Sequence, residues 1–397
     1  MVERYSWHMP LDSQSKSRIA IVTREWPPEI YGGAGVHVMN LVKSLKKFSD
    51  NQVDVHCFGP ERDDAKAYQL TPSFNNLNSA LKTLLLDMNI AENLGNFDLV
   101  HSHTWYANFA GYLASTIFGV PHVITSHSLE PLRPWKADQL GGGYSISSWI
   151  EQISYENAHK IISVSDAVRS DILKVYPTIS PERIVTIRNG IDTEIFKPNA
   201  NSEVLARFGI DDKFAIFVGR ITRQKGLIHL LRSWRSIPKE FGLVIAATSA
   251  DEPHIFEEVQ NLISELQKER ENVIWIGEML PQEDLISLLT HADIFVCPSI
   301  YEPLGIVNLE AMACETAVVA TAVGGIPEVV LDGVTGILIE HSNIDEEFEE
   351  SLRMGILKVM RDSNLAESLG KNGRIRAITE FGWDKVAAQT TNVYRSI

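Results

Sequence analysis

Cysteine is scarce in this sequence, whose 397 residues include only Cys57, Cys297 and Cys314. Because two of them lie beside apolar strand-like runs, buried free thiols in a reducing cytoplasm fit better than a disulfide framework. Long apolar runs are also missing, since no stretch approaches the ~18 residues of a membrane-spanning helix. Residues 1–17 lack the apolar core and cleavage site of a secretion signal, so we expect a flexible leader on a cytoplasmic protein with no membrane partner.

The sequence also lacks an excess of positive charge. The net charge of −15 and the pI near 5.3 argue against a general binder of nucleic acids or membrane surfaces, so any phosphate site must be local. Metal-ligand spacing is missing as well. His101 and His103 suggest a metal site, but no carboxylate or third histidine has suitable spacing. The sequence therefore predicts neither a metal nor another cofactor.

What the chain does contain is an alternation of strands and helices long enough for two domains. Continuous apolar runs followed by segments of helical periodicity predict an α/β fold with two doubly wound, Rossmann-like domains. The turn signals divide the chain into a leader (1–17), a first domain (18–198), a linker (199–212), a second domain (213–380) and a last helix (381–397).

The segment 297–310, CPSIYEPLGIVNLE, organises the second half. It follows a buried strand and enters a helix near Leu304 and Gly305, at the sheet edge where open α/β folds bind ligands. Glu302 is expected on the loop and Glu310 in the helix, where carboxylates accept hydrogen bonds from hydroxyl groups. The alternative is that Glu302 is an ordinary loop residue and Glu310 belongs to a solvated helix face.

Two further strand-to-helix junctions suggest phosphate binding. At the first, Gly32 and Gly33 belong to the run YGGAG, where glycines let the backbone approach a ligand. A dinucleotide is an alternative there, although the G-x-G-x-x-G fingerprint is absent. At the second junction, Arg220 and Lys225 flank a turn before a helix, which makes an anion site unless both cations are simply solvated.

Polar residues also follow two strands of the first domain. The runs 101–103 and 125–127, which contain His101, His103 and His127, are expected just past strand ends, where side chains project toward a ligand. His127 could equally be a hydrogen-bonded core histidine. The segment 133–150 is expected to be a loop, and its Arg133 and Trp135 suit a sugar acceptor, because aromatic faces stack on sugar rings. A flexible surface connection is equally plausible for this segment.

Together these motifs resemble the group 1 family of retaining GT-B glycosyltransferases, which includes glycogen and sucrose synthases. The resemblance rests on the E-x7-E pair, the G-R-x-x-x-x-K-G loop, the YGGAGVH stretch and the loop after His127, and it covers residues 18–397. Residues 301–313 and the first loop are most similar to short actinobacterial-type glycogen synthases. One departure is Thr104, where many glycogen synthases have an aspartate.

The resemblance implies that glucose moves from ADP-glucose to an α-1,4-glucan or to glucose 1-phosphate, across a cleft between the domains and without a metal. Arg220 and Lys225 would hold the leaving diphosphate, Glu302 the glucosyl hydroxyls, Glu310 the ribose, and His127 the sugar near the reacting carbon. The donor-binding residues would be Gly32, Gly33, Leu304, Gly305, Ile306 and Glu310. The acceptor-binding residues would be His103, Arg133 and Trp135.

Other classes stay open at this point. A different nucleotide sugar or acceptor is compatible with the same motifs, a NAD-dependent dehydrogenase shares the α/β pattern, and a non-catalytic nucleotide-sugar sensor would keep the binding loops. The expected partners are a nucleotide-sugar donor and a glucan or sugar-phosphate acceptor, with a homodimer as a further possibility and no nucleic acid.

Overall fold

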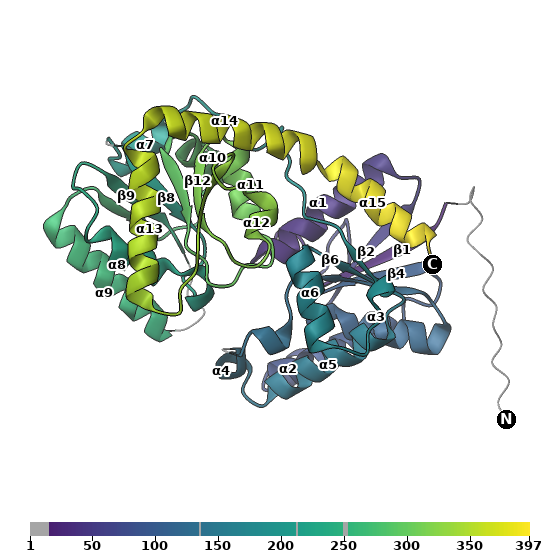
Figure 1. The fold of residues 1–397 in the computed structure, drawn as a ribbon. Coiled ribbons are helices and arrows are strands. Elements are labelled where there is room, and N and C mark those ends of the chain that lie inside the picture. The colour runs from purple at the N-terminus through teal and green to yellow at the C-terminus, as the bar shows by residue number, and fades with distance from the viewer. Residues whose placement is uncertain (1–15, 135, 212, 249–252) are drawn as a thin grey trace. The chain divides into compact units, whose positions relative to one another are not determined.

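A computed structural model describes residues 16–134, 136–211, 213–248 and 253–397 (Figure 1). The chain forms two compact units. Unit 1 contains the described residues up to Arg188 together with Trp383–Ile397, and unit 2 is Asn189–Gly382. None of the described helices is long and apolar enough to span a membrane. All three cysteines are free and buried, which confirms the prediction from the sequence.

Unit 1 is built on a seven-stranded parallel sheet with the order β3-β2-β1-β4-β5-β6-β7. The strands Arg18–Thr23, Leu99–His103 and His122–Ser126 are buried along nearly their whole length rather than at alternate residues, because helices cover both faces of a parallel sheet. The strands are β1 Arg18–Thr23, β2 Gln52–Phe58, β3 Lys66–Tyr68, β4 Leu99–His103, β5 His122–Ser126, β6 Lys160–Ser163 and β7 Ile184–Thr186.

The helices of unit 1 connect these strands and include the end of the chain. They are α1 Gly33–Phe48, α2 Ser79–Ala91, α3 Trp105–Phe118, α4 Lys136–Leu140, α5 Gly143–Asn157, α6 Asp166–Val175 and α15 Trp383–Arg395, with short 3₁₀ turns η1 Pro72–Phe74, η2 Glu130–Leu132 and η3 Pro181–Arg183. Figure 1 shows α15, drawn in yellow, beside α1. Trp383, Val386 and Tyr394 of α15 belong to the same buried core as Ile19 and Leu41.

Unit 2 repeats the architecture with a six-stranded parallel sheet of order β10-β9-β8-β11-β12-β13. Its strands are β8 Phe214–Val218, β9 Gly242–Ala246, β10 Val273–Ile276, β11 Ile294–Cys297, β12 Ala317–Thr321 and β13 Gly336–Ile339. Its helices are α7 Glu203–Phe208, α8 Leu227–Trp234, α9 Pro253–Glu269, α10 Gln282–His291, α11 Ile306–Ala313, α12 Ile326–Val329, α13 Asp345–Met360 and α14 Ser363–Glu380, with the turn η4 Arg223–Lys225.

The strand orders locate the ligand edges. In unit 1 the chain reverses direction across the sheet between β1 and β4, and in unit 2 it does so between β8 and β11. Ligands of open α/β sheets bind outside the carboxyl ends of the strands at such a switch point. The loops after β1, β8 and β11 carry the glycine run, the Arg220/Lys225 turn and Glu302, so the sequence motifs fall at these two edges.

Several expectations from the sequence are wrong. The segment 133–150 is largely helical, because its three consecutive glycines join α4 to α5 rather than forming a long loop. His101 and His103 lie within β4, not past its end. The predicted linker 199–212 contains α7 and belongs to unit 2, where the Asn199 amide donates to Thr290 Oγ1 over 3.2 Å. The boundary therefore comes earlier, at Asn189, while most of the leader lies outside the described residues.

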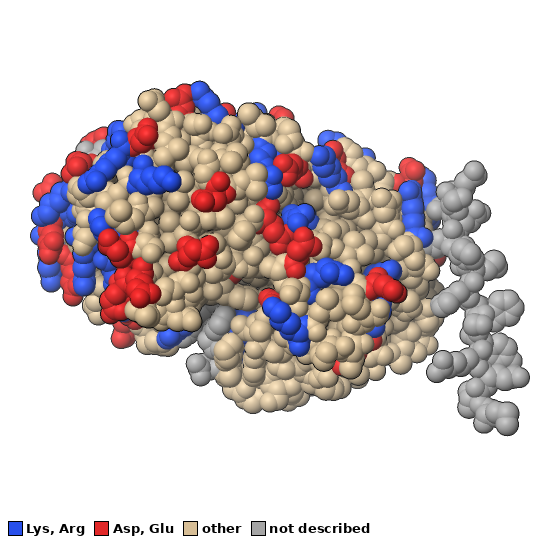
Figure 2. Space-filling model, viewed as in Figure 1, with Lys and Arg blue, Asp and Glu red and all other residues tan. Residues whose placement is uncertain are grey.

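Charges of both signs are mixed over the surface. Figure 2 shows Lys and Arg interspersed with Asp and Glu on the visible face of the molecule, instead of one extended basic surface. This distribution, with the net charge of −15, agrees with the inference that any anion site is local.

Candidate functional site

The edge of unit 2 contains an ion pair between two residues that the sequence analysis selected. Lys225 Nζ lies 2.5 Å from Glu302 Oε2, and the side chains are only 17% and 10% exposed. The Ser299 hydroxyl donates to the same carboxylate oxygen over 3.3 Å. The alternative of ordinary solvated loop residues is therefore wrong for Lys225 and Glu302.

The environment of Lys225 keeps it charged. Burial acts to lower the pKa of the ammonium group, but the neighbouring Glu302 carboxylate outweighs that effect and leaves the pKa above its ordinary value. Arg220 lies close enough for its positive charge to oppose this rise. A fixed ammonium group beside a guanidinium is suited to bind a doubly charged anion.

Glycines let the loops of this edge pack against one another. Gly226 has φ +65°, and a methyl group added there would overlap the Pro298 carbonyl. Gly324 has φ +53°, and a methyl group there would overlap the carbonyl of Glu302. Because only glycine combines these conformations with such close approach, the loops after β8, β11 and β12 form one packed unit around Glu302.

The start of α11 supplies further groups to this edge. Gly305 is its N-cap with φ +93°, and no side chain among the described residues caps the helix. The Asn308 amide donates to the Gly305 carbonyl over 3.0 Å, so the N–H groups of Ile306 and Val307 remain for a ligand. Leu304 is buried beneath them, and Ile306 begins the helix. Glu310 lies one turn further on, where burial raises the pKa of its carboxyl group to about 7, with Lys225 acting in the opposite direction.

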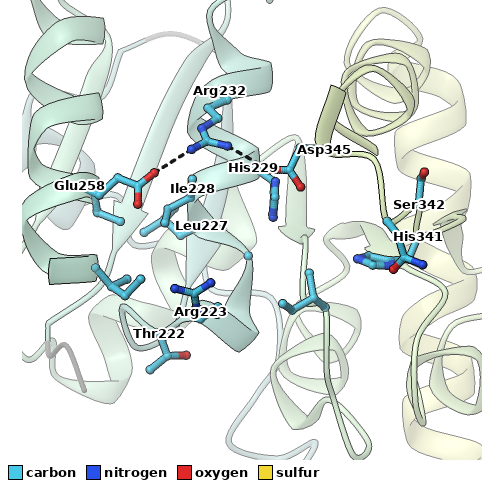
Figure 3. A pocket seen from close by; sticks show the side chains of 15 residues that line it. Thr222, Arg223, Leu227, Ile228, His229, Arg232, Glu258, His341, Ser342 and Asp345 are labelled. Atoms are coloured by element: carbon cyan, nitrogen blue, oxygen red, sulfur yellow. Dashed lines mark hydrogen bonds and ion pairs between the residues drawn. The ribbon is translucent and has the colours of Figure 1, made fainter. Parts of the chain in front are cut away.

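A cavity of about 310 Å³ lies on another side of η4 (Figure 3). Its wall includes Thr222 and Arg223 from the turn and Arg232 from α8, and Figure 3 shows His341 and Ser342 opposite them. Arg232 contacts Glu258 at 2.8 Å and Asp345 at 3.3 Å, so its charge is already offset. The described residues that line the cavity do not include Lys225, Glu302 or Glu310, so the cavity is separate from the ion pair.

The edge of unit 1 is a cluster of histidines. His103 Nδ1 lies 3.1 Å from His127 Nε2, and His101 packs on His103 with ring centroids 4.4 Å apart. His101 contacts the Tyr394 hydroxyl through Nδ1 and the Thr125 hydroxyl through Nε2, both at 2.7 Å. Burial and neighbouring imidazoles lower the pKa of all three histidines well below the ordinary value, so they are neutral near pH 7.

A fourth histidine, His37, which sequence reasoning missed, completes this cluster. The ring of His37, in α1, lies 4.8 Å from His127 and 5.6 Å from His103 between centroids. The expectation that no third histidine is suitably placed is therefore wrong. The position of His37 in the sequence could have identified it. The residue comes one turn after Gly33 on the same helix face, and it therefore lies near the sheet edge.

The glycine run has a structural partner that the sequence analysis also missed. Glu25, just after β1, accepts hydrogen bonds from the amides of Tyr31 at 2.9 Å and Gly32 at 3.1 Å. Gly32 is the N-cap of α1 and Gly33 its first residue, while Gly35 faces Glu25 so closely that a methyl group there would clash with the carboxylate. Glu25 therefore fixes the conformation of this loop.

Arg133 belongs to a buried network behind the His127 loop. Its guanidinium lies 3.8 Å from Glu130 and donates to the Ser128 hydroxyl over 3.2 Å. The buried Glu151 of α5 accepts from the Glu130 amide and from the Tyr176 hydroxyl, the latter over 2.7 Å. Burial raises the pKa of Glu151 to about 8. Trp135, the other predicted acceptor residue of this segment, lies outside the described residues.

Comparison with known proteins adds to this geometry. The family described as "Glycosyl transferases group 1" matches residues 201–376, and "Glycosyltransferase Family 4" matches residues 31–195. Alpha-maltose-1-phosphate synthase of Mycolicibacterium smegmatis is 49% identical over 386 residues, covering 96% of this chain and 99% of the relative. The enzyme of that name from Mycobacterium tuberculosis is 48% identical over the same length.

Solved structures show the same fold. Sucrose-phosphate synthase from Thermosynechococcus elongatus superposes with a TM-score of 0.77 at 24% identity, covering 96% of this chain and 99% of that one. The catalytic domain of starch synthase IV from Arabidopsis thaliana, bound to ADP and acarbose, gives 0.74 at 16% identity, with 96% and 99% coverage. With two parallel-sheet units and full-length relatives at nearly half identity, this chain belongs to the group 1 glycosyltransferases of GT-B fold, enzymes that transfer a hexose from a nucleotide-sugar donor to an acceptor.

Proposed function

We propose that this enzyme is a retaining glucosyltransferase that moves glucose from ADP-glucose to glucose 1-phosphate and so forms maltose 1-phosphate. The observation that carries the proposal is the 49% identity, over 96% of the chain, to a relative named alpha-maltose-1-phosphate synthase. The ADP-glucose donor rests on the YGGAGVH stretch and residues 301–313, which resemble glycogen synthases that use it.

The charge distribution of unit 2 supports binding of the diphosphate there. As the bond from the anomeric carbon to the phosphate oxygen breaks, negative charge grows on the departing ADP. Lys225 and Arg220 supply the opposing charge, and the uncapped N-terminus of α11 adds N–H donors. Because two cations already neutralise the leaving group, transfer needs no divalent metal.

The neutral edge of unit 1 supports binding of uncharged hydroxyl groups. His127 is an imidazole rather than an imidazolium at pH 7, so it donates or accepts a hydrogen bond without adding charge beside the sugar. Arg133 is the nearby cation that we assign to the acceptor phosphate. The acceptor oxygen bonds to the anomeric carbon on the face that ADP leaves, and its proton passes to the departing phosphate oxygen.

A donor and acceptor screen tests the proposal. We expect ADP-glucose with glucose 1-phosphate to give the highest kcat/KM among ADP-, GDP- and UDP-glucose combined with glucose 1-phosphate, maltose and glycogen. Release of ADP and formation of a phosphorylated disaccharide are measured together, and the anomeric configuration of the product is read by NMR. Higher turnover with UDP-glucose, with glycogen as the acceptor, or with an inverted product would refute the corresponding part.

A further inference from the structure

The histidine cluster of unit 1 brings together three imidazoles from separate elements. His37 lies in the second turn of α1, His103 is the last residue of β4, and His127 directly follows β5. One ring nitrogen of each lies within 4.8 Å of the other two. Nothing in the proposed transfer reaction requires three histidines this close together.

The hydrogen bonding of His103 is incomplete. Its Nδ1 faces His127 Nε2 at 3.1 Å, while its buried Nε2 has no hydrogen-bond partner among the described residues, and the side chain is 0% exposed. Burial lowers the pKa of His103 and His127, so both rings keep a lone pair near pH 7. Neutral imidazole is the form that coordinates a transition metal.

We propose that His37, His103 and His127 form a binding site for one Zn²⁺ ion, which inhibits the enzyme when it is bound. Zinc takes imidazole nitrogens at about 2.0–2.1 Å, which places neighbouring ligand atoms of a tetrahedral site about 3.3 Å apart. The His103 and His127 nitrogens, 3.1 Å apart, are already near that spacing. The nitrogen of His37 lies within 4.8 Å of the other two, so it has to approach by no more than about 1.5 Å. Three imidazoles leave the fourth position of a tetrahedral site for water.

The three imidazole ligands restrict the site to transition-metal ions. All three ligands are imidazoles, which suit Zn²⁺, Cu²⁺ and Ni²⁺, whereas Mg²⁺ and Ca²⁺ require oxygen ligands. Histidine ligands in strong sites donate their second ring N–H to an acceptor, and such a partner is worth about 10- to 100-fold in affinity. His103 Nε2 has no such partner among the described residues, so the ion binds reversibly rather than as a permanent structural metal.

The inhibition rests on the proposed function, because it follows only if His127 contacts the transferred sugar. An ion bound to His127 would occupy the lone pair of the ring and hold the ring in place, so that His127 could no longer accept a hydrogen bond from the sugar. The metal site itself does not depend on that role. Binding measured without any substrate therefore tests the site, and inhibition tests the role of His127 separately.

The chain provides a matched control in unit 2. His229, Asp345 and Glu349 also bring ligand atoms within 4.8 Å of one another. However, Arg232 lies 3.3 Å from Asp345 and 3.4 Å from Glu349, so a cation there would have to displace a guanidinium. We expect His229→Ala to bind zinc as the wild type does.

The experiment is a titration of the full chain with Zn²⁺, and separately with Co²⁺ and Mg²⁺, followed by calorimetry and by the visible spectrum of tetrahedral Co²⁺. We expect one equivalent of Zn²⁺ and a Co²⁺ spectrum for the wild type and His229→Ala. We expect about tenfold weaker binding or more for His37→Ala and His37→Gln. Circular dichroism identifies a variant that fails to fold, and His37→Gln keeps a side chain of similar volume.

Equal binding by wild type and a folded His37 variant would overturn the proposal, as would equal binding of Mg²⁺ or loss of binding in His229→Ala. If zinc binds through His37 but leaves transfer unaffected, the site stands and the inhibition claim fails, together with the role assigned to His127. If zinc inhibits, EDTA should restore the rate completely.

Discussion

The two sheet edges occupy the same topological position and have opposite chemistry. In unit 2, Lys225 and Glu302 form an ion pair at 2.5 Å. In unit 1, burial with no carboxylate partner among the described residues leaves His101, His103 and His127 neutral. Burying a charge is tolerable only when a partner offsets the loss of hydration. The fold therefore provides the location of a site, and the availability of a partner decides whether it carries charge.

The difference matches the two halves of a sugar transfer. A nucleotide diphosphate brings negative charge that has to be matched, whereas the sugar hydroxyl groups near the histidines bring hydrogen bonds, and the phosphate of the proposed acceptor is assigned to Arg133. An edge with fixed cations suits the first ligand and a neutral, hydrogen-bonding edge suits the second. The predictions below test this contrast in order of decreasing expected effect.

Acidification should produce the largest difference in stability between the two units. The pKa values of five histidines in unit 1 are lowered: His56 to about 4, His122 to about 3, and His101, His103 and His127 also well below the ordinary value. Below pH 6.5 the unfolded state binds these protons and the native state does not, so stability present above pH 6.5 is lost as the pH falls. Each histidine contributes about 1.4 kcal/mol per pH unit in this range.

Three carboxyl groups of unit 1 oppose this trend. Burial raises the pKa of Asp87, Glu151 and Asp171, so between their unfolded and folded values they stabilise the native state as the pH falls. The histidines outnumber them, and we expect unit 1 to lose protection before unit 2 between pH 7 and pH 5.5. Hydrogen exchange measured by mass spectrometry reports each unit separately. His122→Asn should reduce the pH dependence, and simultaneous opening of both units would contradict the contrast.

Removing a cation from the unit 2 edge should have the next largest effect. Arg220→Ala and Lys225→Ala each remove charge that we assign to the leaving diphosphate, so each should cost about 3 kcal/mol in the transition state, or roughly a hundredfold in kcat. Arg223→Ala changes an exposed residue of the same turn and serves as the matched control. Equal rates for all three variants would leave the diphosphate site without support.

Lys225→Ala should also affect stability, unlike the other two variants. It leaves the buried Glu302 carboxylate without its ammonium partner, which costs about 1–3 kcal/mol in the free energy of unfolding. Denaturant titration measures this loss. The double variant Lys225→Ala/Glu302→Gln should recover most of the stability and none of the activity, which separates the structural role of the pair from its role in transfer.

Glu310 should make donor binding depend on pH, and we expect this effect to be smaller than those above. With a pKa raised to about 7 by burial, its carboxyl group is mostly ionised at pH 8 and mostly protonated at pH 6. A carboxylate accepts hydroxyl hydrogen bonds more strongly, so the KM for the nucleotide sugar should rise as the pH falls. Glu310→Gln should raise KM up to about tenfold at pH 8 and much less at pH 6. A constant ratio of the two KM values across this range would remove Glu310 from the donor site.

Chelation should have the smallest effect of all. Because we assign the role of a metal at the leaving group to Lys225 and Arg220, EDTA should leave the rate of transfer unchanged in metal-free buffer. The rate is followed by release of nucleoside diphosphate with and without the chelator. Loss of activity that Mg²⁺ or Mn²⁺ restores would show that Lys225 and Arg220 are insufficient.

The sequence predicted the two α/β halves because apolar runs and helical periodicity are local signals. It also predicted that Lys225 and Glu302 lie at the same edge of a sheet, since both follow strands that end there. It missed Glu25, whose carboxylate accepts from amides only six and seven residues along its own loop, because no periodic pattern marks such a contact. It missed His37 because its contacts are with His103 and His127, far along the chain. The neutral state of the histidines was likewise invisible, because burial by surrounding elements sets it.

The chain crosses between the units twice, near Asn189 and near Gly382, and Ile191 pairs with Gly382 where the crossings meet. This connectivity sets an order of assembly during synthesis. Unit 2 is continuous in the chain and can fold once residue 382 has left the ribosome, whereas the core of unit 1 must wait for Trp383, Val386 and Tyr394. The half of the enzyme that is made first is therefore completed last, and until then the apolar face that α15 covers stays open to other partners, including chaperones.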